Sequence, residues 1–144
     1  MSDVATSIDI DASPEDIWRT VMDPTRLGEW VTIHRKLVSY SEDEMEQVLH
    51  LRGANFKVKW HLDSSRAPHH ATWKGRGPAR SHAETEYRLT ANGEGGTRFD
   101  YRNEFRAPLG PLGALASSAL VGGLPAKEAE ASLKRLKALV ERGG

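Results

Sequence analysis

The first residues of the chain alternate between apolar and polar side chains, the pattern of a strand with one buried face. Within residues 4–10 the even positions carry Val, Thr, Ile and Ile, whereas the odd positions carry Ala, Ser and Asp. Residues 13–16, Ser-Pro-Glu-Asp, then predict the start of a helix, because serine caps a helix, proline suits its first position and acids suit its first turn. The Asp-Pro pair at 23–24 ends this helix, and a second short helix follows through Trp30.

Beyond Trp30 the chain changes to strands separated by turn residues. Turn signals at residues 42–43, 53–54 and 95–96 divide this region into short segments. Because each connection is short, we expect consecutive strands to pair antiparallel as hairpins. The predicted strands cover residues 33–41, 44–52, 55–63, 69–75, 81–91 and 97–106.

The last predicted hairpin has a register that satisfies both of its faces. A turn centred on residues 92–96 matches apolar with apolar side chains on the inner face and opposite charges on the outer face, where Arg88 meets Asp100 and Glu86 meets Arg102. A slip of one residue would exchange the two faces. The inner pairs are Leu89 with Phe99, Tyr87 with Tyr101, and Thr85 with Asn103.

The earlier strands are expected to add further aromatic side chains to the same inner face. A turn at residues 53–54 places Gln47 opposite Trp60. The next turn brings Trp73 onto the inner face, and His69 then also points inward. The pattern therefore predicts a sheet with one face that is rich in aromatic residues and carries few polar groups.

The end of the chain has helical rather than strand periodicity. Pro125 opens the helix, and Ala129, Leu133, Leu136 and Val140 follow at spacings of 4, 3 and 4, which places them on one helical face. Charged side chains take the opposite face. We expect this helix to pack its apolar side against the sheet.

Two segments near the ends of the chain carry a resemblance to a known family. They are residues 8–18, Ile-Asp-Ile-Asp-Ala-Ser-Pro-Glu-Asp-Ile-Trp, followed by Asp23 and Trp30, and residues 132–141, Ser-Leu-Lys-Arg-Leu-Lys-Ala-Leu-Val-Glu. With the order of elements, they resemble the START-like, or SRPBCC, superfamily, and most closely its polyketide cyclase/dehydrase and lipid-transport group. The resemblance implies an α+β helix-grip fold, with residues 1–144 as a single domain. In that fold a curved antiparallel sheet of six to seven strands wraps around a long C-terminal helix, and two short helices follow the first strand.

A cavity between the sheet and the final helix is the candidate functional site. The resemblance implies such a cavity, and the mostly small side chains of residues 114–123 independently leave space opposite the aromatic face. Our leading hypothesis is the binding or transport of a small hydrophobic molecule of lipid, polyketide or aromatic type, oriented by the few polar inner groups. The candidate ligand-binding residues are Trp30, Gln47, Trp60, His69, Trp73, Thr85, Tyr87, Phe99, Tyr101, Asn103, Leu115 and Ala119.

Catalysis and protein interaction remain as alternatives. An enzyme of the polyketide cyclase/dehydratase type would use the same cavity, with His69 or a tyrosine moving a proton and Asn103 holding a carbonyl. No catalytic motif is visible in the sequence, and phosphate-binding loops are absent. The other alternative is an interaction module with an incidental pocket. We expect no metal or other cofactor, because outer-face histidines such as His61 and His70 lack a compact ligand spacing.

Composition and charge narrow the choice of partners. The chain has 144 residues with 20 basic and 20 acidic side chains, so it lacks the basic excess of a nucleic-acid binder. It contains no cysteine, which excludes disulfides and thiolate chemistry.

Residues 107–126 are uncharged but contain three prolines and four glycines, so we expect a kinked buried segment rather than a membrane span. No secretory signal is visible, and we expect a cytoplasmic monomer or weak homodimer. The basic residues expected to form a solvated rim at one end of the sheet are Arg66, Lys74, Arg76 and Arg80.

Overall fold

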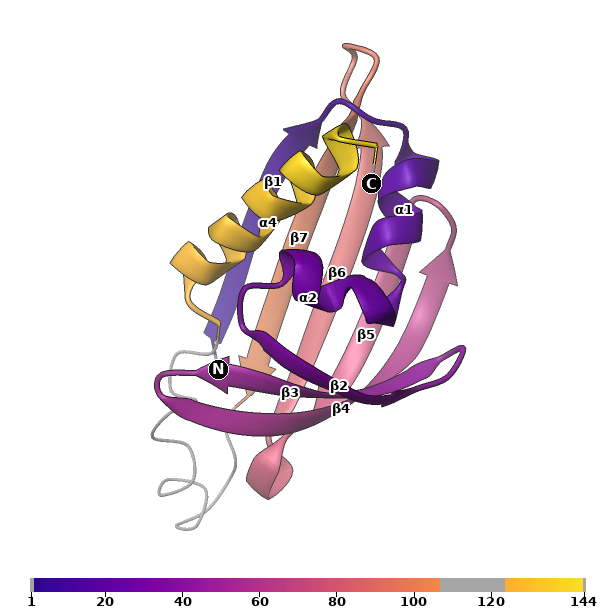
Figure 1. The fold of residues 1–144 in the computed structure, drawn as a ribbon. Helices are drawn as coiled ribbons and strands as arrows, with labels where there is room; N and C mark the ends of the chain where they lie inside the picture. Colours follow the sequence, from indigo (N-terminus) through magenta and orange to yellow (C-terminus); the bar gives the residue numbers. More distant parts are fainter. Residues whose placement is uncertain (1, 107–123, 144) are drawn as a thin grey trace.

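A seven-stranded antiparallel sheet wraps around the C-terminal helix in the computed structural model, which describes residues 2–106 and 124–143. The strands lie in the order β1-β7-β6-β5-β4-β3-β2. The elements are β1 (Ser2–Ile10), α1 (Pro14–Val21), the 3-10 turn η1 (Pro24–Arg26), α2 (Leu27–Trp30), β2 (His34–Tyr40), β3 (Glu44–Leu51), β4 (Ala54–Arg66), β5 (His70–Arg76), the 3-10 turn η2 (Pro78–Arg80), β6 (His82–Ala91), β7 (Thr97–Arg106) and α4 (Ala126–Glu141) (Figure 1). The predicted helix-grip fold is confirmed.

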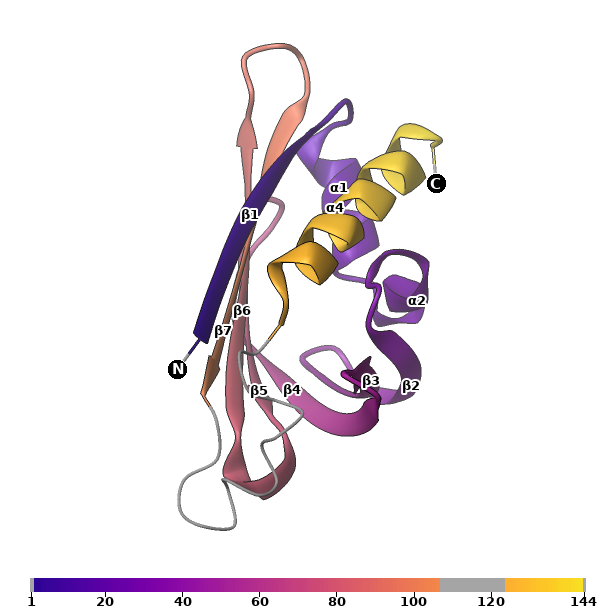
Figure 2. The same ribbon diagram turned by 90° about the vertical axis from the view of Figure 1, so that its left-hand side faces the viewer.

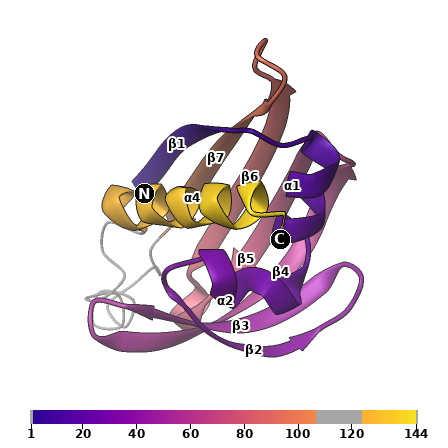
Figure 3. The same cartoon turned by 45° about the horizontal axis from the view of Figure 1, so that its top comes forward.

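The helices α1, α2 and α4 of the described residues lie on the same side of the sheet, which bends toward them (Figure 2). The strands β2, β3 and β4 curl beneath α2, while α4 lies between β1 and α2 (Figure 3). The predicted inner positions of α4, namely Ala129, Leu133, Leu136 and Val140, are all buried. The concave side of the sheet and one face of α4 therefore form the core.

The helix α1 and the 3-10 turn η1 begin directly after the capping residues Ser13 and Asp23. The Ser13 hydroxyl accepts a hydrogen bond from the backbone N–H of Asp16 at 3.2 Å, which caps α1. The Asp23 carboxylate accepts hydrogen bonds from the backbone N–H and hydroxyl of Thr25 at 3.0 and 2.6 Å and so caps η1. These caps fix the turn between α1 and α2. This turn places Trp30, the last residue of α2, over the sheet.

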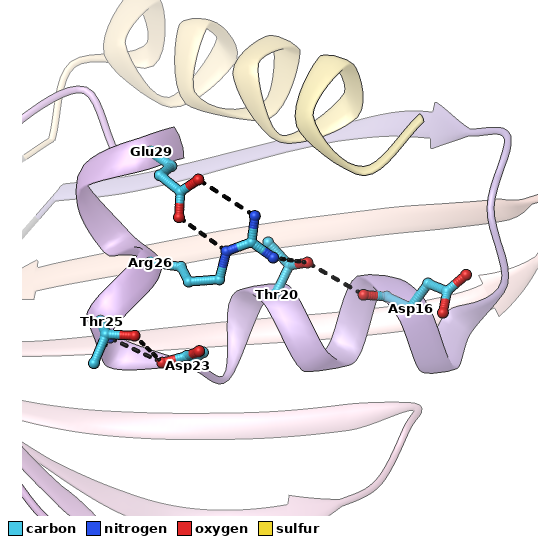
Figure 4. A network of polar contacts seen from close by, with 6 residues as sticks. All are labelled: Asp16, Thr20, Asp23, Thr25, Arg26 and Glu29. Carbon is cyan, nitrogen blue, oxygen red and sulfur yellow. Dashed lines mark hydrogen bonds and ion pairs between the residues drawn. The ribbon is translucent and has the colours of Figure 1, made fainter. Parts of the chain in front are cut away.

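An arginine joins α1 to α2 on the outside of this turn (Figure 4). The Arg26 guanidinium donates to both carboxylate oxygens of Glu29, at 2.9 and 3.3 Å, and to the Thr20 hydroxyl at 3.4 Å. The Thr20 hydroxyl in turn donates to the backbone carbonyl of Asp16 at 3.3 Å. Surface ion pairs contribute little stability on their own, so the main effect of this network is to orient α2.

The register of the last hairpin is as predicted. Leu89 faces Phe99, Tyr87 faces Tyr101 and Thr85 faces Asn103. On the outer face the like-charged pair of Glu84 and Glu104 also occurs, and Arg102 and Arg106 lie 3.6 Å from the Glu104 carboxylate. These neighbouring guanidinium groups offset the repulsion between the two facing acids.

The predicted register of β3 with β4 is wrong by two residues. Gln47 faces Val58, and Trp60 faces Met45. The reason is the turn, which is formed by Arg52 and Gly53, both with positive φ (50° and 80°), rather than by residues 53–54. Such two-residue turns match the twist of paired strands. A shift of two residues keeps every side chain on its face, so Gln47 and Trp60 still point inward.

The predicted pairing of β4 with β5 fails for a different reason. An irregularity between Leu62 and Ser64 shifts the register, and β4 runs on to Arg66. His69 therefore lies exposed in the turn, with its Nδ1 3.2 Å from the Leu89 carbonyl oxygen, and the expectation that it points inward is wrong. The same register pairs Arg66 with His70, at the end of β5 opposite to Arg76.

The predicted basic rim is consequently divided between two ends of the sheet. Arg66 lies at the β4–β5 turn, whereas Arg76 and Arg80 lie at the other end of β5. Lys74 is 3.7 Å from the Asp63 carboxylate. The four residues do not form one cluster. In the part of the chain that the structure describes, no helix is long and apolar enough to cross a membrane.

Candidate functional site

A cavity of about 130 Å³ lies between the concave face of the sheet, α2 and the first turns of α4. Its wall is mostly apolar and combines aromatic side chains from the sheet with aliphatic ones from the helices. This combination of an apolar wall with a few polar groups is typical of small-molecule sites. The predicted site residues that line it are Trp30, Gln47, Trp60, Trp73, Thr85, Tyr87, Tyr101 and Asn103.

The other four predicted residues do not line the described part of the cavity. His69 lies exposed in the β4–β5 turn, because β4 is longer than predicted. Phe99 is fully buried behind Tyr87, with ring centroids 5.5 Å apart, and packs in the core. Leu115 and Ala119 lie outside the described residues. The role of the remaining eight in ligand binding stays a prediction.

Three side chains from neighbouring strands form a hydrogen-bonded chain along one wall. The Trp60 indole Nε1 donates to Gln47 Oε1 at 2.6 Å, and Gln47 Nε2 lies 2.8 Å from His34 Nδ1. An indole N–H can only donate, so Gln47 must present its oxygen to Trp60 and its amide N–H to His34. His34 is therefore neutral, with its proton on Nε2.

Burial lowers the pKa of His34, which favours the same neutral form. Sequence reasoning placed Gln47 and Trp60 on the inner face but missed His34. The pairing of β2 with β3 contains two irregularities, between His34 and Lys36 and between Leu37 and Ser39. No alternation pattern can predict such irregularities, so the sequence carries no signal that brings His34 to Gln47.

A second polar cluster lies across the cavity on β6 and β7. Asn103 Nδ2 donates to the Thr85 hydroxyl oxygen at 2.9 Å, and the polar groups of both residues act to lower the pKa of Tyr101, against the larger effect of burial. Burial raises the pKa of Tyr101 and of Tyr87 well above the usual range, so both phenols stay neutral at physiological pH. These groups can hydrogen bond with a ligand, but neither tyrosine can act as a base near neutral pH.

The helix α4 is attached to the cavity rim by a serine on its buried face. The Ser132 hydroxyl accepts a hydrogen bond from the backbone N–H of Thr32 at 3.1 Å. The Thr32 hydroxyl also donates to the Glu128 carboxylate at 2.7 Å. These contacts hold the first turns of α4 against the loop between α2 and β2, and so fix one side of the cavity.

The cavity wall contains no Asp, Glu, Lys or Arg side chain among the described residues. Its ionisable side chains are His82, exposed at the rim, the buried Tyr87 and the half-buried Tyr101. Within residues 2–106 and 124–143, no three His, Cys, Asp or Glu side chains lie close enough together to hold a metal ion. The outer-face histidines His61 and His70 do not face each other: His61 faces Lys74, and His70 lies 2.6 Å from the Glu86 carboxylate.

An antiparallel sheet wrapped around a C-terminal helix, with an apolar cavity between them, defines the helix-grip class of proteins. The family model described as polyketide cyclase/dehydrase and lipid transport matches residues 1–141. The chain belongs to this family, which confirms the resemblance found in the sequence.

Relatives of similar length occur in Mycobacterium tuberculosis. The chain is 31% identical to Uncharacterized protein Rv1546 of Mycobacterium tuberculosis, over 96% of this chain and 99% of the relative. It is 28% identical to Toxin Rv0910 of the same organism, over 83% and 88% of the two chains. The fold is similar to the crystal structure of a conserved protein from Geobacillus kaustophilus, with a TM-score of 0.77, 18% identity and coverage of 98% and 96%.

Proposed function

We propose that the protein binds a small, largely apolar molecule in the cavity between the sheet and α4. The observation that carries this proposal is the cavity itself, about 130 Å³ with a mostly apolar wall and polar groups at a few points. An empty space of this size in a protein interior is costly, because its lining atoms lose their packing partners. A bound molecule would restore those contacts. The family description, which includes lipid transport, supports the same class of function.

The first experiment is native mass spectrometry of freshly purified protein, together with titration of the neutral fluorescent dye N-phenyl-1-naphthylamine. We expect a copurified small molecule or saturable binding of the dye. Ala129 on α4 is fully buried and lines the cavity. Its replacement in Ala129→Phe places a phenyl ring in the cavity, and we expect dye affinity to fall by roughly tenfold or more, because each 1.4 kcal/mol of lost binding is tenfold.

The matched control is Ala138→Phe, the same substitution on the exposed face of the same helix. It should leave dye affinity unchanged, and circular dichroism should show that both variants keep the native fold. Absence of dye binding to the original protein, or equal binding by both variants, would contradict a cavity ligand.

Binding is better supported than catalysis by the groups that surround the cavity. The predicted proton-transfer residue His69 lies outside it, and Tyr87 and Tyr101 remain neutral. Among the described lining residues there is no carboxylate or lysine that could act as a base. A carrier needs none of these groups, because burial of an apolar ligand supplies most of its affinity. A monomer or weak homodimer stays our expectation, and sedimentation velocity measures it.

A further inference from the structure

One residue of the cavity lining carries a buried polar atom without a hydrogen-bond partner. The Trp30 side chain lines the cavity and is only 1% exposed, and its indole Nε1 makes no hydrogen bond within the described structure. Among residues 2–106 and 124–143, it is the one buried side-chain nitrogen or oxygen without a hydrogen-bond partner. A buried donor without an acceptor is costly, and such exceptions in native proteins call for an explanation.

Two groups of polar side chains around the cavity are already hydrogen bonded among themselves. The Trp60 indole donates to Gln47, whose amide N–H reaches His34. Asn103 donates to the Thr85 hydroxyl oxygen at 2.9 Å. A ligand that forms hydrogen bonds with these two clusters must compete with bonds that exist, whereas an acceptor placed at Trp30 Nε1 gains a new one.

The charge of the wall restricts the kind of acceptor. The described lining contains no Lys or Arg, so a carboxylate or phosphate in the cavity would lack a counter-charge. Burial of an unpaired anion costs far more than burial of a neutral carbonyl. The neutral Tyr87 ring, which meets Trp30 edge to face with centroids 6.0 Å apart, adds no positive charge at this position.

We infer that Trp30 selects uncharged ligands that carry a hydrogen-bond acceptor, of the ketone or amide carbonyl class, by donating its indole N–H to that oxygen. This inference rests on the proposed function, because it assigns the ligand class of the same cavity. Trp30 is then a specificity-determining residue, and the aromatic and aliphatic wall accommodates the apolar remainder of the ligand.

The test compares three compounds of nearly equal shape. 2-Acetylnaphthalene carries a carbonyl, 2-isopropenylnaphthalene replaces its oxygen by a methylene, and 2-naphthoate carries a charge. We expect the ketone to bind roughly three- to tenfold more tightly than the alkene in calorimetric titrations, the range that one net hydrogen bond supplies. The carboxylate should bind most weakly of the three.

A spectroscopic measurement on the unaltered protein reports on the N–H itself. The chain has four tryptophans, so its ¹H–¹⁵N spectrum should contain four indole resonances, and Trp30→Phe identifies the one of interest. The ketone should move the Trp30 proton resonance downfield, and the alkene should not. In Trp30→Phe the affinity ratio of ketone to alkene should fall to about one. The control Trp18→Phe, which removes an indole outside the cavity lining, should keep the ratio.

The outcomes separate the inference from the function on which it rests. Equal binding of ketone and alkene, with the Trp30 resonance unmoved by both, would overturn the inference and leave the proposed function intact. Tighter binding of the carboxylate than of the ketone would also overturn it. If none of the three compounds bound, the proposed function and the inference would fail together.

Discussion

Replacement of Gly75 by alanine tests how closely the Trp60 indole lies on β5. These two residues face each other across β4 and β5. A Cβ atom at position 75 would lie 2.7, 2.8 and 3.0 Å from Cε3, Cζ3 and Cδ2 of the indole ring. Carbon atoms in contact normally lie about 3.5–4.0 Å apart. Alanine therefore fits only if the whole ring moves away from the strand.

The ring is not free to move, because its other edge is hydrogen bonded. The Trp60 Nε1 lies 2.6 Å from Gln47 Oε1, and Trp60 is 7% exposed. Overpacking of this kind costs about 1–3 kcal/mol. Stretching or loss of the hydrogen bond adds about 0.5–1.5 kcal/mol. We expect Gly75→Ala to lower the free energy of unfolding by about 1.5–4.5 kcal/mol in total, a sum of the two effects.

Urea unfolding measures this change, and the chain offers a matched control. Gly28 lies in α2, and a Cβ there would meet only His34 Cδ2 at an ordinary 3.6 Å. Gly28→Ala should therefore be neutral or stabilise the protein by up to about 1 kcal/mol, the difference in helix propensity.

A double-mutant cycle identifies the cause of the loss. In a Trp60→Leu background the indole ring is absent, so the added methyl group has no ring to displace. Gly75→Ala should then cost less than about 1 kcal/mol. A cost that persisted in this background, or a Gly75→Ala protein as stable as the original, would refute the reasoning.

Three further predictions follow from contacts described above. Burial lowers the pKa of His34 in the folded protein. The protein should therefore have its full stability above about pH 6.5 and lose it as the pH falls below that value, by at most about 1.4 kcal/mol per pH unit. His34→Gln should flatten this slope in urea titrations. Asn103→Leu should destabilise the protein by about 1–3 kcal/mol, because it removes the amide that donates to the Thr85 hydroxyl, and unchanged thermal unfolding would contradict that. Leu136→Ala, at a fully buried position of α4, should cost about 2–5 kcal/mol, whereas Lys134→Ala on the exposed face should stay within about 0.5 kcal/mol by the same assay.

The parts of the fold that could be predicted are those fixed by local pattern. The register of β6 with β7 follows from side chains that must match on both faces, as Leu89 does with Phe99 and Arg88 with Asp100. The buried face of α4 follows from helical spacing in the same way. In these cases each residue restricts its neighbours, so one arrangement satisfies all of them.

The parts that could not be predicted depend on single backbone irregularities. The alternation along β4 gives no sign of the irregularity between Leu62 and Ser64. A regular strand predicts that His69 points inward, whereas the actual strand places it in a turn. His34 reaches Gln47 only because β2 is also irregular. The unpartnered state of the Trp30 indole depends on every atom around it, and no pattern along the chain encodes that.

The position of β1 in the sheet has a consequence for the order of events during synthesis. β1 pairs along its whole length with β7, whose residues lie about ninety to a hundred positions further along the chain. The hairpins from β2 to β6 can form while translation continues, but β1 has no edge to join until β7 has left the ribosome. Contacts of such long sequence separation form slowly. Until then β1, with Ile8 and Ile10, stays available to other partners, so a pause in translation before Arg106 should expose the nascent chain to aggregation or to chaperone capture.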